Sequence, residues 1–157
     1  MTSNRDVATS FYKAFAARDG AAMAVAYSPD AEFSDPAFGD LRGRDIGDMW
    51  RMLCVRAKDL TIEFQIVEDR GGEVHVNWQA RYTFAKTGRV VLNRIHATMT
   101  IQDGKIVKHR DQFSFWSWSA QALGPIGMLL GWAPFLQTSV RRTALDGLRA
   151  FQKSAKA

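Results

Sequence analysis

The sequence predicts a single α+β domain in which N-terminal helices pack against an antiparallel sheet. Its 157 residues are enough for one domain with its own core. Apolar residues recur every three or four positions in the first third of the chain, and at every second position in the middle. A hydrophobic content of 46% and a charged content of 24% are typical of globular proteins rather than disordered ones.

Helices dominate the first third of the chain. A cap at Ser3 begins the first helix and Asp19-Gly20 ends it, while Asp19 caps the next. The expected elements are a helix over 5–18, a short helix carrying Met23, Ala26 and Tyr27, a strand over 31–35, a loop over 39–43 and a helix whose apolar stripe runs from Ile46 to Cys54.

Four strands joined by tight turns follow in an antiparallel meander. They are expected over residues 60–68, 74–84, 89–101 and 106–116. The strongest turn signal is Asp103-Gly104, because both residues tolerate the positive φ angles of a type I′ turn.

That turn also predicts a register. If Gln102 pairs with Lys105, every opposed pair of the last two strands is fixed, and alternate pairs share one face of the sheet. The pairs expected on that face are His96 with Asp111, Arg94 with Phe113, and Thr98 with His109.

The segment after the strands has an unusual composition. Residues 112–140 contain no Asp, Glu, Lys or Arg, and two prolines and three glycines interrupt the apolar run from Leu123 to Leu136. A membrane-spanning helix is therefore not expected there. Residues 135–151 predict an amphipathic basic helix. We expect one domain over residues 1–157, with a core of about 5–116 and a C-terminal helical extension of about 117–157.

Charge and cysteine content narrow the classes of partner and compartment. The net charge is +5, but residues 141–157 account for most of it, so the domain body is nearly neutral. No stripe of Lys and Arg with interleaved aromatics is present, and nucleic-acid binding is not expected. A single cysteine, Cys54, and the absence of a secretory leader predict a cytoplasmic protein.

Two segments resemble members of the nuclear transport factor two-like superfamily. The run from Tyr27 to Pro36, with Gly43-Arg44 beginning the next helix, resembles ketosteroid isomerases, in which the Asp before Pro is the catalytic base. This resemblance implies that role for Asp35. The segments 104–106 and 110–113 are similar to the final strands of SnoaL-like polyketide cyclases and limonene epoxide hydrolases, where an Asp at the place of Asp111 is an acid or base.

The resemblance implies a cystatin-like or ketosteroid isomerase-like fold, which is a cone-shaped, strongly curved antiparallel sheet around the N-terminal helices. It also implies a homodimer formed through the sheet. Phe11 stands at the oxyanion-hole Tyr of the isomerases, with Tyr12 next to it, and His96 stands at the oxyanion-hole Asp. Trp78 and Ala80 replace the Arg and Asp of the epoxide hydrolases, so epoxide hydrolysis by that triad is excluded.

The catalytic candidates are Asp35, His96 and Asp111. An apolar cavity would raise the pKa of Asp35 toward the range useful for removing a proton next to a carbonyl, whereas the alternative is an ordinary Asp-Pro turn. His96, oriented by Asp111, would stabilise an oxyanion, whereas the alternative is a purely structural pair. The substrate-binding candidates are Tyr12, Phe33, Trp50, Arg94, Phe113 and Phe115.

No metal or cofactor is expected, because His96 and His109 with Asp111 lack the spacing of a metal site. Two functions remain open. One is a small cofactor-independent isomerase, cyclase or lyase that binds a small apolar carbonyl compound. The other is a non-catalytic ligand-binding or protein-interaction domain. The apolar stretch Ala122–Leu136 is a lid, a dimer contact or a membrane-surface element, and the first two are favoured over the third.

Overall fold

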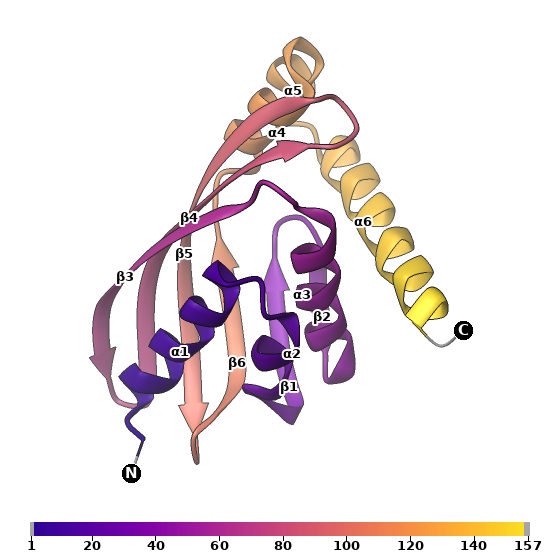
Figure 1. The fold of residues 1–157 in the computed structure, drawn as a ribbon. Helices are drawn as coiled ribbons and strands as arrows, with labels where there is room; N and C mark the ends of the chain where they lie inside the picture. Colours follow the sequence, from indigo (N-terminus) through magenta and orange to yellow (C-terminus); the bar gives the residue numbers. More distant parts are fainter. Residues whose placement is uncertain (1, 156–157) are drawn as a thin grey trace.

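Six strands form one mixed sheet, and six helices lie against its faces and ends (Figure 1). The computed structural model describes residues 2–155. The strands are β1 (Tyr27–Asp35), β2 (Gly39–Arg42), β3 (Thr61–Arg70), β4 (Glu73–Phe84), β5 (Arg89–Gln102) and β6 (Lys105–Gln112), in the spatial order β2-β1-β6-β5-β4-β3. The helices are α1 (Asn4–Ala16), α2 (Gly20–Val25), α3 (Arg44–Arg56), α4 (Phe115–Leu123), α5 (Pro125–Leu130) and α6 (Pro134–Ala155). The predicted α+β class is confirmed.

The helix starts follow the local signals in the sequence. Ser3 caps α1 by accepting a hydrogen bond from the backbone N–H of Asp6, whose carboxylate accepts one from the Ser3 N–H. Asp19 caps α2 by accepting a hydrogen bond from the backbone N–H of Ala22. Before α3, Gly43 adopts a φ of 57°, a backbone conformation that favours glycine.

Two features of the sheet differ from the predicted meander. The segment expected as a loop over 39–43 contains β2, which pairs with the end of β1. In addition, β1 lies parallel to β6, so the sheet is mixed rather than wholly antiparallel. This parallel pair brings the first and last strands of the domain side by side.

The predicted turn is confirmed, but the predicted register is wrong beyond it. Asp103 and Gly104 have positive φ angles, and Gln102 pairs with Lys105. Val107 is then an extra residue in β6, because Ile101 pairs with Ile106 while Thr100 pairs with Lys108. From there the register shifts by one residue. Ala97 lies opposite Asp111, His96 opposite Gln112, and Thr98 opposite Arg110.

This bulge separates the side chains that were expected together. Asp111 and His109 point into the core, against α1 and α3, and both are buried. Arg94 and His96 lie on the opposite, outer face of the sheet, where His96 contacts Asn77 and His75. The predicted pairs His96–Asp111, Arg94–Phe113 and Thr98–His109 do not form.

The last strand is shorter than predicted, and the extension begins earlier. β6 ends at Gln112 because Ser114 caps α4 through the backbone N–H of Ser117. α4 packs on the far ends of β4 and β5 in a second apolar cluster made by Val91, Phe115, Trp118 and Ala122. The predicted basic helix is present as α6 and extends over Pro134–Ala155.

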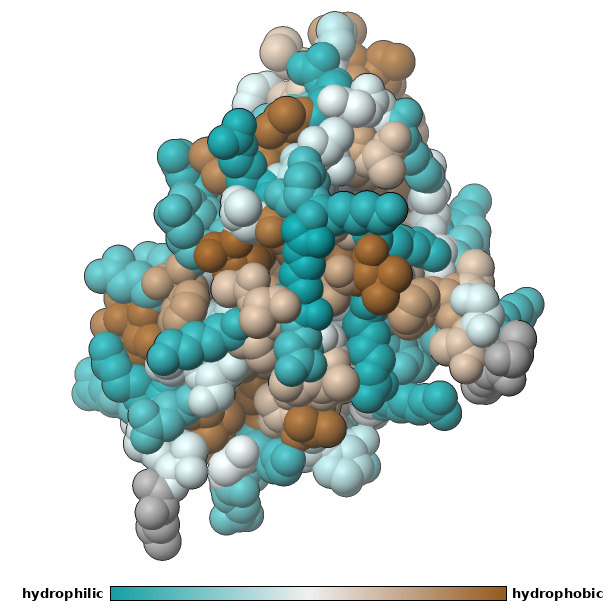
Figure 2. All heavy atoms as spheres, in the orientation of Figure 1, coloured by the Kyte–Doolittle hydropathy of each residue, from teal (hydrophilic) through white to brown (hydrophobic). Residues whose placement is uncertain are grey.

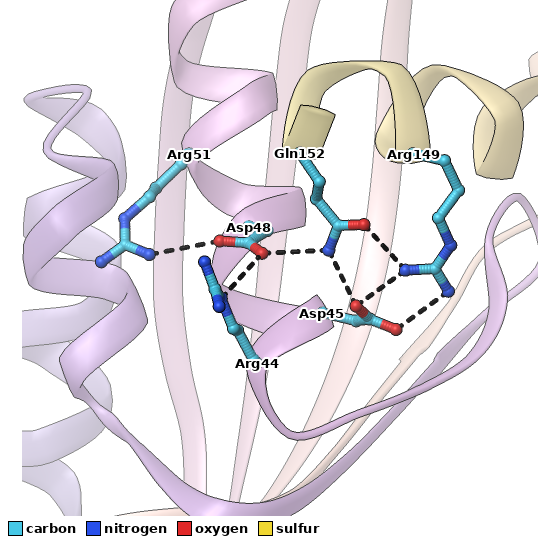
Figure 3. A network of polar contacts seen from close by, with 6 residues as sticks. All are labelled: Arg44, Asp45, Asp48, Arg51, Arg149 and Gln152. Atoms are coloured by element: carbon cyan, nitrogen blue, oxygen red, sulfur yellow. Dashed lines mark hydrogen bonds and ion pairs between the residues drawn. The ribbon is translucent and has the colours of Figure 1, made fainter. Parts of the chain in front are cut away.

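α6 runs back along the molecule and docks on α3 (Figure 1). Leu148 is its fully buried contact with the main core. Around it, the Arg149 guanidinium donates two hydrogen bonds to Asp45, and the Gln152 amide donates to both Asp45 and Asp48 (Figure 3). Arg149 therefore holds the pKa of Asp45 below its usual value. Within the described residues, no helix has both the length and the apolar composition needed to cross a membrane.

Substitutions of two neighbouring residues of α6 compare the apolar and the ionic contacts that hold this helix to the rest of the domain. We expect Leu148→Ala to lower the free energy of unfolding by about 3 kcal/mol, because it leaves a cavity in the core. Arg149→Ala should cost less than about 1 kcal/mol, since its side chain is 54% exposed and its ion pair is solvated. Urea denaturation of both variants measures the difference, and a larger loss for Arg149→Ala would contradict it.

Candidate functional site

An aromatic cluster surrounds one histidine in the interior of the sheet. His109 extends from β6 and lies within 5.1 to 6.1 Å, ring centroid to ring centroid, of four aromatic rings. They belong to Phe11, Tyr27, Phe33 and Trp50. Its side chain is completely buried, so its polar atoms must be satisfied inside the protein.

A continuous hydrogen-bond chain satisfies those atoms. The indole N–H of Trp50 donates to the Tyr27 hydroxyl oxygen over 2.9 Å, and that hydroxyl lies 2.7 Å from Nδ1 of His109. Nε2 of His109 lies 2.8 Å from Oδ1 of Asp111, which also accepts from the Trp78 indole N–H at 3.3 Å. The chain therefore joins α3, β1, β6 and β4.

The direction of this chain assigns the tautomer of His109. An indole N–H can only donate, so the Tyr27 oxygen accepts from Trp50 and its own proton goes to Nδ1 of His109. Nε2 then carries the ring proton and donates to Asp111. With a proton on Nε2, every N–H and O–H group of the chain has an acceptor. Asp111 is consequently held in one orientation.

Asp35 lies at the end of β1, where both sequence interpretations of it apply. Its Oδ1 accepts the backbone N–H groups of Ala37 and Phe38, at 2.9 and 2.5 Å, which is the turn expected of Asp-Pro. Burial nevertheless raises the pKa of this carboxyl to about 7, and the charge of Asp111 adds to the increase against the opposing effect of the Phe38 N–H. Asp35 is thus a carboxyl group able to gain or lose a proton near neutral pH.

Tyr12 has a hydroxyl group without a partner. Its side chain extends from α1 into the core, is fully buried, and stacks on Phe64 at 5.3 Å between ring centroids. Within residues 2–155, its hydroxyl is one of two buried side-chain polar atoms that lack a hydrogen bond. Burial, and then the charge of Asp111, raises the pKa of this phenol well above its usual value. It is a free hydrogen-bond donor in an apolar interior.

The remaining sequence candidates fall into three places. Phe33 and Trp50 belong to the aromatic cluster around His109. Phe113 is half-buried between the two apolar clusters, while Phe115 belongs to α4 and the second cluster alone. Arg94 and His96 line a groove of about 600 Å³ on the outer face of the sheet. These last two residues therefore cannot act with Asp111.

The sequence interpretation missed the roles of His109 and Tyr27. Residues two apart in a strand share a face, so the spacing of His109 and Asp111 alone was enough to pair them, whatever the register. Tyr27 carried no such signal, since it was expected at the end of a helix and lies in β1. In the part of the chain that the structure describes, no three His, Cys, Asp or Glu side chains are grouped to hold a metal ion.

The hydrogen-bond chain can be tested by comparing the stability of two tyrosine-to-phenylalanine variants. Tyr27→Phe leaves both the Trp50 N–H and Nδ1 of His109 without a partner, so we expect it to cost about 2 kcal/mol of folding free energy. Tyr12→Phe removes a hydroxyl that has no partner and should be neutral or slightly stabilising. Chemical denaturation of the two variants measures this, and equal losses would rule out the assigned chain.

Comparisons with known proteins agree with this architecture. The model of the SnoaL-like domain matches residues 8–109. A search among curated proteins found no significant match. IdmH from Streptomyces antibioticus, a proposed polyketide cyclase, is 25% identical with a TM-score of 0.61, covering 74% of this chain and 96% of its own.

Two further solved structures share the fold at lower identity. A Catenulispora acidiphila protein with a ketosteroid isomerase-like fold, solved with trimethylamine, has a TM-score of 0.68 at 15% identity, covering 78% of this chain and 96% of that one. A proposed polyketide cyclase from Silicibacter has a TM-score of 0.67 at 13% identity, covering 75% and 93%. The family match spans well over half of the sequence, and the chain belongs to the SnoaL-like domain family.

Proposed function

We propose that this protein is a cofactor-independent enzyme that moves a proton next to the carbonyl group of a small apolar compound, as an isomerase or a cyclase. One observation carries the proposal: burial raises the pKa of Asp35, at the end of β1, to about 7, and the charge of the buried Asp111 adds to the increase. A carboxyl group whose surroundings raise its pKa toward neutrality is typical of an acid–base site.

Asp35 is the proton shuttle in this mechanism. Its Oδ1 is occupied by two backbone N–H groups, so Oδ2 is the free oxygen. In the ionised form, Oδ2 takes a proton from the carbon next to the carbonyl, and the C–H electron pair forms the C=C bond of an enolate. Asp35 then returns the proton to another carbon in an isomerisation. In a cyclisation, the enolate carbon instead attacks a second carbonyl, and the proton goes to the new alkoxide.

Tyr12 stabilises the enolate oxygen. A buried hydroxyl without a partner is ready to donate a hydrogen bond to the oxygen on which negative charge develops. Its raised pKa keeps the proton on the phenol while it does so. Tyr12 thereby takes the place proposed from the sequence for His96, which lies on the outer face of the sheet.

Asp111 is a positioning residue that acts on Asp35 and Tyr12 through its charge. It raises the pKa of both groups, and the hydrogen bonds from His109 and Trp78 keep it in place. Phe33 and Trp50 supply the apolar surroundings that a small hydrophobic substrate requires. The likeness to IdmH, a proposed polyketide cyclase, supports the cyclase side of the proposal.

We also propose a cytoplasmic setting and a homodimer formed through the outer face of the sheet. A reducing compartment suits Cys54, which is a free and buried thiol. The outer face of the sheet has a groove lined in part by polar residues such as Asn77 and Gln79, and a second copy of the chain would cover this groove.

The second candidate function, ligand binding or protein interaction without chemistry, is favoured by the filling of the interior. Phe11, Tyr12 and Phe33 are each at most 2% exposed, so the protein's own side chains occupy the space beside Asp111. On this alternative the interior polar groups serve stability, and Asp35 has no role in turnover.

Two aspartates of the β1–β2 hairpin separate these functions. We expect Asp35→Asn to abolish proton exchange at the carbon next to the carbonyl of an aromatic ketone such as 2-tetralone, followed by NMR in D2O. Asp40→Asn, at an exposed position of the same hairpin, should leave exchange unchanged. Full exchange by Asp35→Asn would remove the mechanism. Absence of exchange in the wild type, together with a thermal shift produced by the same ketone, would favour the binding function.

The raised pKa of Asp35 also predicts how stability depends on pH. Because this carboxyl has a pKa of about 7 in the folded protein, against an ordinary value of 3.8, the folded protein binds the proton more tightly than the unfolded chain does. That contribution is present at low pH and is lost as pH rises from about 4 to about 7. We therefore expect Asp35→Asn to gain stability relative to the wild type between about pH 5 and about pH 8, measured by urea denaturation. An unchanged difference would show that Asp35 titrates normally.

A further inference from the structure

One end of the molecule presents large apolar side chains to solvent. α5 and its flanking residues form the end farthest from both termini in Figure 1, and brown apolar atoms reach the surface at this end in Figure 2. Leu129 is 71% exposed and Trp132 is 75% exposed. We call this surface the apolar tip, and it consists of Trp116, Ile126, Met128, Leu129, Trp132 and Phe135. Contiguous exposed apolar surface of this kind marks an interaction site.

The exposed side chains of the apolar tip do not fit a lid, which was one of the alternatives left open by the sequence. Ala122 of α4 packs in the second cluster, but Ile126 and Leu129 of α5 face away from the protein. The residues that contact the Asp35 turn come instead from α6, where the Gln137 amide donates to the carbonyl oxygen of Pro36 at 3.1 Å. The tip is therefore left without a partner within residues 2–155.

Several polar groups of the tip donate hydrogen bonds within the protein. The indole N–H of Trp116 donates to the carbonyl oxygen of Met128 at 3.0 Å, and that of Trp132 donates to Leu129 at 2.7 Å. The backbone N–H groups of Gly131 and Ala133 also donate within the tip. If this surface moved from water to an apolar medium, these donors would keep their acceptors. The transfer would therefore not carry the free-energy cost of burying unpaired donors at these positions.

The two chain segments that meet at this end carry basic residues but no acidic ones. Residues 74–102 and 112–145 contain no Asp or Glu. Hydrogen bonds from Thr87 to Ala122 and from Arg89 to Gln121 hold the β4–β5 turn against α4. This contact brings Lys86 and Arg89 to the same end of the molecule, and the exposed Arg142 lies about two helical turns along α6 from Phe135. We call Lys86, Arg89 and Arg142 the basic collar.

We propose that the apolar tip inserts into the surface of an anionic lipid bilayer, with the basic collar facing the headgroups. Tryptophan rings suit the interface between headgroups and acyl chains, and adjacent cations are attracted by anionic lipid. A second copy of the chain fits this surface less well. Symmetric pairing would bring two basic collars together, whereas a lipid surface provides the opposite charge.

Flotation with vesicles tests this proposal. We expect the wild type to float with vesicles of phosphatidylcholine containing phosphatidylserine, and to bind vesicles of phosphatidylcholine alone much more weakly. The double variant Ile126→Ser with Leu129→Ser should bind at least about tenfold more weakly, because two side chains no longer enter the acyl region. The matched control is Val55→Ser with Val67→Ser, which changes two valines that are 64% and 54% exposed elsewhere, and it should bind normally.

A charge variant completes the test. Lys86→Gln with Arg142→Gln should remove the preference for phosphatidylserine while circular dichroism stays unchanged. Equal flotation of the tip variant and the wild type would overturn the proposal, and so would flotation that ignores lipid charge. Sedimentation velocity tests the alternative occupant of the tip, which is a second copy of the chain. A wild-type oligomer that Ile126→Ser with Leu129→Ser dissociates, without any vesicle binding, would assign the tip to a second copy of the chain.

Discussion

A buried carboxylate sets the constraint on which the interior depends. The Asp111 side chain is only 3% exposed, and a charge removed from water is costly unless hydrogen bonds surround it. Its partners are His109 on β6 and Trp78 on β4, and His109 in turn engages Tyr27 on β1 and, through it, Trp50 on α3. Satisfying this one group therefore fixes the relative positions of three strands and a helix.

The bulge in β6 determines which residues can meet that requirement. The alternation of the strands and the Asp103-Gly104 turn are local signals, so the sequence alone predicted the meander and the pairing nearest the turn. Val107 is an ordinary strand residue with no glycine beside it, and nothing local marks it as the extra residue. Its effect is nevertheless to move every later pair by one position, which places His96 outside. Site geometry that depends on a one-residue register cannot be obtained from local pattern alone.

The C-terminal extension shows a second limit of the same kind. Its composition predicted a basic helix, and α6 confirms it, but the docking site depends on contacts more than a hundred residues apart in the chain. Asp35 and Asp111 could be proposed from the sequence because motif and family resemblance are local. Tyr12 gained weight only from the structure, since an unpartnered hydroxyl is a property of packing. The family match ends at residue 109, before Asp111 and the C-terminal extension.

α6 connects the two functional regions proposed for the molecule. Phe135 belongs to the apolar tip, while Gln137 and Arg141 lie at the turn beside Asp35, where a Cβ atom on Gly39 would come within 2.8 Å of the Arg141 Nε. Six residues of helix separate Phe135 from Arg141, a rise of about 9 Å. If the tip enters a lipid surface, the Asp35 turn lies close to that surface, because a single rigid helix sets the distance. An apolar carbonyl compound partitions into lipid, so the Asp35 turn would then lie close to the place where the proposed substrate collects.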